Sequence, residues 1–185
     1  MKIKYTQNIE RLENINMTFT KRFFGHLKTV HNHRKMVRKL CFKCGLYWQG
    51  LTHDLSKYHP VEFWNGVKYF TGTASPHLGE RTEKGYSDAW VHHHNHNKHH
   101  GEYWQDIDKN GKACPINMPY EYIQEMVCDR VAASMTYLGD KYYDAAPLEY
   151  YLSHMDENQF ADYTRKRLEY LLNEIASYGF EGAML

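Results

Sequence analysis

The chain has 185 residues, of which 42% are apolar and 24% charged, a composition that fits one globular domain and excludes a disordered chain. Lys and Arg number 23 against 22 Asp and Glu, so the formal charge of +1 argues against a molecule that binds nucleic acid through its overall field. No apolar run reaches the roughly 18 residues that would span a bilayer, so we expect no membrane-spanning helix.

Hydrophobic spacing predicts helices along most of the chain. The clearest covers residues 21–45, where apolar side chains recur every three or four positions and Gly45 is a suitable stop. A second is expected over about residues 47–54, and Pro60 opens a third because proline is tolerated in the first helical turn. Residues 71–86 are expected to form a loop.

The downstream half is also predicted to be helical. Ser87 with Asp88 caps a short helix that carries a cluster of histidines. The elements expected after it are a turn-rich connection over residues 101–118, a long helix over about 120–138, a helix that starts at Pro147 and a last helix over about 158–178. Strand-like alternation is missing apart from short runs, so the predicted fold class is all-α, in one domain over residues 1–185 with a core of about 20–155.

The four cysteines are expected to be reduced thiols in the cytoplasm, because the polar N-terminal stretch has no apolar segment of the kind that directs export. Cys41 and Cys44 form a C-x-x-C pair, which could be half of a zinc site or a redox pair. We favour two small buried residues on a helix, because the helical pattern continues through them and no second C-x-x-C follows.

A strongly basic stretch lies in the first helix: residues 21–43 carry eight Lys and Arg, and no Asp or Glu occurs between Glu13 and Asp54. The simplest explanation is a solvated outer face balanced by acidic residues elsewhere. A second is a positive rim that attracts a phosphorylated substrate. RNA binding is the third, and one basic helix without a recognised motif is a weak indication of it.

Thirteen histidines point to metal or proton chemistry, and His53 with Asp54 is the strongest local signal. Neighbours in a regular helix point about 100° apart, but at a helix end both side chains can converge on one cation. Imidazole nitrogen with carboxylate oxygen suits Mn, Fe, Co, Ni or Zn. Upstream, His26 and His33 share the apolar face of the first helix, so we expect at least one of them to be a ligand.

Further candidates lie downstream of this pair. Asp129 falls on an apolar face of its helix, where either a metal or a buried salt bridge would explain it. Six histidines lie between His92 and His100, either as a surface tract or as ligands of a second metal ion. Lys57, three residues after Asp54, could hold an anionic substrate, although a solvated lysine is the simpler explanation.

Several of these residues occur in an order known from one superfamily. They are His26, His53, Asp54, Lys57 and Asp129. This H…HD-x-x-K…D order resembles the HD-domain superfamily of metal-dependent phosphohydrolases, and GLTHDLSKY is similar to its signature segment. The chain also resembles a small uncharacterised, Tyr-rich bacterial and phage family within that superfamily, through segments such as HLKTVHNHR and CDRVAAS.

The resemblance implies an HD-like helical bundle that binds one or two divalent transition metal ions (Mn, Fe, Co, Ni or Zn). It also implies that Asp54 is catalytic and that Lys57 orients a small anionic substrate. The implied metal ligands are His26, His53, Asp54 and Asp129 for one ion, and His92 or His93 together with His99 and His100 for a second.

The leading predicted function is hydrolysis of a phosphate ester, in a nucleotide or a small phosphorylated metabolite. The alternatives are a di-iron oxygenase of the HD type and a non-catalytic, metal-braced module that binds a ligand. Neither nucleic acid nor a membrane is an expected partner, and assembly into a homo-oligomer is left open.

Overall fold

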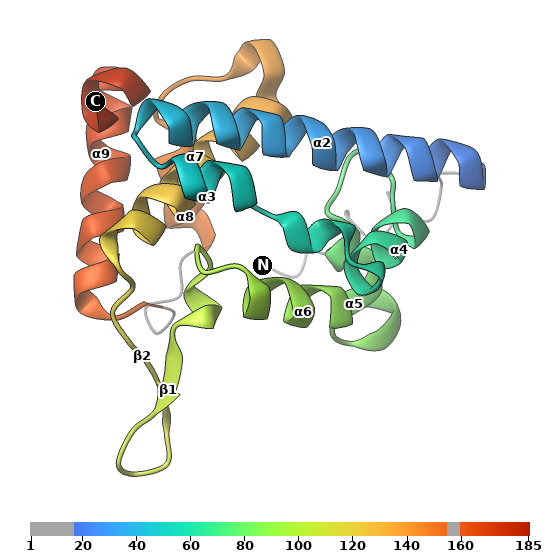
Figure 1. The fold of residues 1–185 in the computed structure, drawn as a ribbon, viewed down its shortest axis with the longest axis horizontal. Coiled ribbons are helices and arrows are strands. Elements are labelled where there is room, and N and C mark those ends of the chain that lie inside the picture. The colour runs from blue at the N-terminus through green and yellow to red at the C-terminus, as the bar shows by residue number, and fades with distance from the viewer. Residues whose placement is uncertain (1–16, 155–159) are drawn as a thin grey trace. The chain divides into compact units, whose positions relative to one another are not determined.

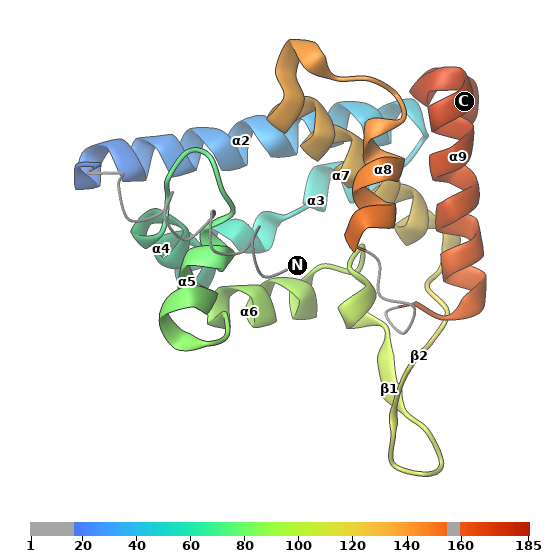
Figure 2. The same ribbon diagram turned by 180° about the vertical axis from the view of Figure 1, so that it is seen from behind.

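Helix α2 (Phe19–Lys43) is a long helix (Figures 1 and 2), as the spacing of its apolar residues predicts. Val30, Val37 and Leu40 are buried along it, on the face that the sequence predicts. Gly45 has a φ of +74°, a left-handed conformation that glycine adopts without strain, and the helix ends just before it as expected.

The computed structural model describes residues 17–154 and 160–185, so the start of the expected last helix lies outside the described residues. Secondary structure is almost entirely helical, which confirms the all-α class, while the HD type of bundle stays a prediction. Across the helices of the described residues, none combines the length and the apolar character that a membrane crossing requires.

By its internal contacts the chain divides into two units, and α2 contributes to both. Among the described residues, the first unit contains 17–32 and 54–93, and the second contains 33–53, 94–154 and 160–185. The predicted assignment of the whole chain to one domain stays a prediction.

The first unit is built from short helices. They are η1 (Leu55–Tyr58), α4 (Pro60–Lys68), α5 (Pro76–Lys84) and most of α6 (Asp88–His96). The start of α4 at Pro60 is as predicted. The hydroxyl of Ser87 accepts a hydrogen bond from the backbone N–H of Trp90 at 3.0 Å, which confirms Ser87 as the cap of α6.

The expectation of a loop over residues 71–86 is wrong for residues 76–84, which form α5. Pro76 occupies the first turn of this helix and Gly85, with φ +85°, ends it. Glu80 is buried on α5 and accepts a hydrogen bond from the hydroxyl of Ser87 at 2.7 Å. The sequence does not reveal this helix because its stabilising contact is made by a polar side chain and not by a periodic apolar face.

The second unit contains a short hairpin and the longer helices. Its elements besides α2 are α3 (Tyr47–Thr52), η2 (Gly101–Tyr103), β1 (Gln105–Ile107), β2 (Ala113–Pro115), α7 (Tyr120–Leu138), η3 (Gly139–Lys141), α8 (Ala146–His154) and α9 (Asp162–Met184). Strands β1 and β2 pair antiparallel with Asp106 opposite Cys114, so the connection expected over 101–118 includes a hairpin. Helix α7 stops at Gly139 as predicted, whereas α9 continues past a non-helical Gly179.

Helix α7 lies at the centre of the second unit, where it packs against α3, α8 and α9. Its side chains Ile123, Val127 and Val131 are fully buried. Burying an apolar side chain of this size stabilises the fold by about 1.5–3 kcal/mol relative to exposure. Cys41 lies in the same core, as favoured from the sequence, whereas Cys44 follows the end of α2 and is only partly buried against that core. This packing fixes α7 and therefore the acidic side chains that it carries.

Packing in the first unit can be tested at Gly66 on α4, where an added Cβ would lie 2.2 Å from ring atoms of His26. Gly66→Ala must displace this buried ring, so we expect it to lower the free energy of unfolding by about 1–3 kcal/mol in urea denaturation. In a His26→Ala background the methyl group has room, and the same change should be neutral or stabilising. Equal destabilisation in both backgrounds would contradict the packing described.

Candidate metal centre

The chain turns sharply at His53 and Asp54, directly after α3. Asp54 has φ +53° and is the only non-glycine residue with a positive φ in the described part of the chain. This left-handed conformation costs most residues roughly 1–2 kcal/mol, and such strain is frequent at functional sites. Both side chains are buried, at 2% and 1% exposure. The division between the units falls here, with His53 in the second and Asp54 in the first.

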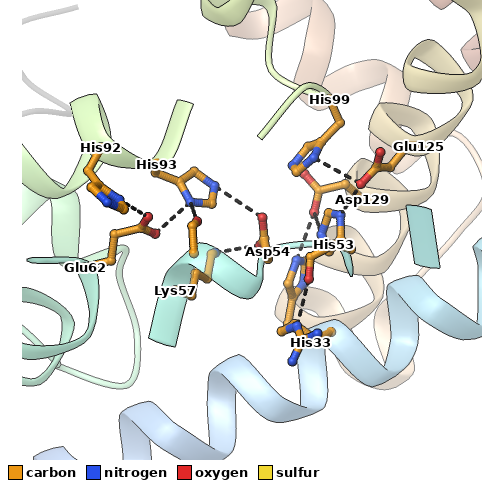
Figure 3. A network of polar contacts seen from close by, with 12 residues as sticks. His33, His53, Asp54, Lys57, Glu62, His92, His93, His99, Glu125 and Asp129 are labelled. Carbon is orange, nitrogen blue, oxygen red and sulfur yellow. Dashed lines mark hydrogen bonds and ion pairs between the residues drawn. The ribbon is translucent and has the colours of Figure 1, made fainter. Parts of the chain in front are cut away.

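Three side chains of the second unit lie close together (Figure 3). His33 comes from α2, His53 from the end of α3, and Asp129 from the middle of α7. Asp129 Oδ1 lies 2.9 Å from His33 Nε2 and 3.6 Å from His53 Nε2. One ligand atom from each residue lies within 4.8 Å of the other two, so this group could hold a metal ion.

Electrostatics keep Asp129 ionised. Burial alone would raise the pKa of its carboxyl, but the contacts with the imidazoles of His33 and His53 hold the pKa well below its usual value. An ionised carboxylate between two imidazoles is the charge state that a cation needs.

Arg34 fixes the end of α3 from the backbone side. Its Nε donates to the carbonyl oxygen of His53 at 2.7 Å, and its Nη2 donates to that of Leu51 at 3.2 Å. Helix α2 therefore contributes one candidate ligand, His33, and also the side chain that positions another.

Glu125 lies one helical turn before Asp129 on α7 and contacts the other nitrogen of His53. Its Oε1 is 2.8 Å from His53 Nδ1 and 3.2 Å from His99 Nδ1. Burial would raise the pKa of Glu125, but hydrogen bonds from these imidazoles bring it below its ordinary value. The ring of His99 lies beside that of His100, with centroids 4.2 Å apart and planes tilted by 45°. His53, His99 and Glu125 form a second group that could hold a metal ion.

Residues of the first unit form a polar cluster of their own kind, built around Glu62 and Asp54 (Figure 3). Glu62, buried on α4, places Oε1 2.6 Å from His92 Nδ1 and Oε2 2.8 Å from His93 Nδ1. His93 Nε2 lies 3.4 Å from Asp54 Oδ1, and Lys57 Nζ lies 3.1 Å from Asp54 Oδ2. Four of the predicted site residues are therefore linked here, and two of them, His92 and His93, share a glutamate that the prediction does not include.

His26, the remaining predicted ligand, has a different environment. Its ring centroid lies 5.4 Å from that of Phe63 and 6.1 Å from that of Phe70, and the ring rests against Gly66. Burial, with a smaller contribution from the charge of Lys57, lowers its pKa to about 4. None of the groups of potential ligands found over residues 17–154 and 160–185 includes His26. Of the two inward histidines on α2, His33 is the one beside a carboxylate.

A family model described as "Family of unknown function (DUF5662)" matches residues 22–174. The chain belongs to this family. The matched range runs from α2 to α9 and includes both clusters. No curated protein and no solved structure matches the chain. Membership in DUF5662 brings no activity with it, so the chemistry of the site itself has to indicate one.

This DUF5662 chain brings into its clusters three side chains that the predicted ligand set does not contain. They are His33, Glu62 and Glu125. Glu125 has a signal in the sequence, because it precedes Asp129 by four residues and so shares its helix face. Glu62 has no such signal in the sequence, because its partners are histidines of another helix, α6.

Histidine replacements on α2 distinguish the two candidate ligands. We expect His33→Ala to weaken Zn²⁺ binding by more than the about 10–100-fold that loss of an outer-sphere partner costs, because a direct donor is lost. His26→Ala should leave the affinity essentially unchanged, and exposed His31→Ala is the control on the same helix. Calorimetric titration of the metal-free protein measures this. Loss of binding in His26→Ala with binding retained in His33→Ala would restore the ligand set implied by the resemblance.

Proposed function

We propose that this DUF5662 protein is a metal-dependent hydrolase of phosphate esters, acting on a nucleotide or a small phosphorylated metabolite. The observation that carries the proposal is the group formed by His33, His53 and Asp129. Two imidazole nitrogens and one carboxylate oxygen suit divalent Mn, Fe, Co, Ni or Zn. We propose that the protein binds one or two of these ions.

The donor set fits such an ion. Asp129 is ionised because its pKa is low, and it supplies the negative charge. Three protein donors leave coordination positions for water and substrate, which is typical of catalytic rather than structural sites. When bound, a divalent metal would lower the pKa of a coordinated water towards 7 and so supply hydroxide at neutral pH.

The chain itself supplies the charge that would attract the substrate. Lys35, Arg38 and Lys39 are exposed on the second-unit part of α2, the helix that also carries His33. Because the formal charge of the whole molecule is only +1, this local concentration of positive charge would decide where an anion approaches. The placement supports a rim that attracts a phosphorylated substrate.

The catalytic roles that the resemblance implies for Asp54 and Lys57 remain part of the proposal. In the first unit these residues form an ion pair of 3.1 Å, so the ammonium group of Lys57 is held beside a carboxylate. A phosphate oxygen can compete for the same ammonium group, because both are anionic acceptors.

We also place the protein in the cytoplasm as part of the proposal. All four cysteines are free thiols. This supports a reducing compartment, since disulfides persist mainly in oxidising ones.

A second candidate function is oxygen activation by iron. Non-haem Fe(II) oxygenases bind their iron through two histidines and one carboxylate. His33, His53 and Asp129 are a set of this composition. The two functions differ in a simple observable: an oxygenase binds iron and consumes O₂ with its substrate, whereas the hydrolase works with a redox-inert or air-stable metal.

The test of the hydrolase is a panel of nucleotides and phosphate esters assayed with Mn²⁺, Co²⁺ or Zn²⁺ added to metal-free protein. We expect metal-dependent phosphate release, and Asp129→Asn should lower kcat/KM by at least about a hundredfold because the anionic ligand is lost. Asp140→Asn, the same change at an exposed position just after α7, is the control. Turnover by Asp129→Asn at the wild-type rate would refute the mechanism. Metal binding without turnover across the panel would favour a metal-braced binding module.

A further inference from the structure

Glu125 is only 5% exposed, yet it lies outside the proposed ligand group of His33, His53 and Asp129. Its Oε1 contacts Nδ1 of His53 at 2.8 Å and Nδ1 of His99 at 3.2 Å, as Figure 3 shows. Asp129 lies at the opposite nitrogen, 3.6 Å from His53 Nε2. His53 therefore stands between two carboxylates, one at each ring nitrogen.

The chemistry of a carboxylate determines where the histidine protons sit. An ionised carboxylate has acceptors only, so an imidazole nitrogen at hydrogen-bonding distance from it must carry the proton. Both Nδ1 atoms that contact Glu125 are therefore donors. In a neutral imidazole with its proton on Nδ1, the lone pair is on Nε2.

We infer that Glu125 is a positioning residue that holds His53 and His99 as Nδ1–H tautomers, so that His53 presents its Nε2 lone pair to the metal ion. The inference rests on the proposed metal centre and deepens it, because it assigns Glu125 a role beside the ligand set. Ligating histidines generally donate their second N–H to a carboxylate or a carbonyl, which fixes the ring and strengthens the donor. Since one oxygen serves both rings, Glu125 orients His53 and His99 together.

The first unit contains the same arrangement independently. Glu62 is 4% exposed and contacts Nδ1 of His92 at 2.6 Å and Nδ1 of His93 at 2.8 Å. The same chemistry makes both rings Nδ1–H tautomers, and His93 Nε2 lies 3.4 Å from Asp54 Oδ1. A buried glutamate that accepts hydrogen bonds from the Nδ1 atoms of two histidines thus occurs in each of the two units.

A competing assignment makes Glu125 itself a metal ligand together with His53 and His99, whose ligand atoms also lie within 4.8 Å of one another. In that arrangement a cation at Glu125 would replace the Nδ1 proton of His53. In ours, the Nδ1 proton remains when the metal binds and only Nε2 changes. The two assignments therefore differ in which nitrogen of His53 responds to metal.

The test is a long-range ¹H–¹⁵N NMR spectrum of the histidine-labelled full chain at neutral pH, without metal and with Zn²⁺. We expect His53 and His99 to carry the Nδ1 proton in both states. Glu125→Met, which keeps the side-chain length but removes the acceptor, should release His53 from the Nδ1–H form and weaken Zn²⁺ binding by about 10–100-fold without changing the number of ions bound. Glu125→Gln keeps an acceptor oxygen and should restore much of both. Glu121→Met, one turn earlier on α7 and exposed, is the matched control.

Each outcome decides the matter. An Nε2–H tautomer of His53 in the metal-free wild type would overturn the inference. Two further results would show that Glu125 is a metal ligand and would also overturn the inference. One is the loss of a bound ion in both Glu125 variants, and the other is replacement of the His53 Nδ1 proton by Zn²⁺. If Glu125→Met does not fold, the wild-type spectra and Glu125→Gln still decide. Zn²⁺ binding with the expected tautomers but without phosphate-ester turnover would reject the proposed function and leave the inference standing. Failure to bind any of the divalent ions of Mn, Fe, Co, Ni and Zn would reject both.

Discussion

Two carboxylates one helical turn apart on α7 set the chemistry of the second unit. Asp129 and Glu125 stay ionised in a largely buried setting because imidazoles donate to them, and the imidazoles in turn are held by these acceptors. Charges that leave water are tolerated only with such partners. Packing of the apolar side chains of α7 therefore fixes the positions of the two carboxylates. Contacts with histidines from three other segments offset the cost of removing these charges from water.

Much of the helical framework is predictable, because its limits depend on local backbone rules. Gly45 and Gly139 follow the ends of helices and Pro60 begins one, as their conformational preferences predict. The choice between His26 and His33 is different in kind. The two residues are about two helical turns apart, so their side chains point in the same direction. They differ in position by about 10 Å along the helix axis, and this difference decides which of them can reach α7. That distance becomes informative only when the neighbouring helices are in place.

The His53-Asp54 pair was identifiable from sequence as a place where the backbone leaves helical geometry, and it does. The sequence could not show that each residue would join a different set of partners, nor that glutamates would face the second nitrogen of several histidines. Glu62 and Glu125 stand in ordinary helical contexts, and their roles depend on contacts with distant segments. The spacing of Glu125 from Asp129 shows only that the two share a helix face, and nothing in the sequence around Glu62 indicates its histidine partners.

The left-handed backbone at Asp54 changes how substitutions there should be interpreted. Alanine would remove the carboxylate and would also have to adopt a backbone conformation that it tolerates poorly. A loss of activity or stability in this variant could therefore come from either change. Asparagine accepts this conformation and keeps the side-chain shape, which isolates the missing charge. A valine or isoleucine would have to rebuild the turn before any question of chemistry arises, so the range of viable residues at position 54 is narrow for reasons of geometry alone.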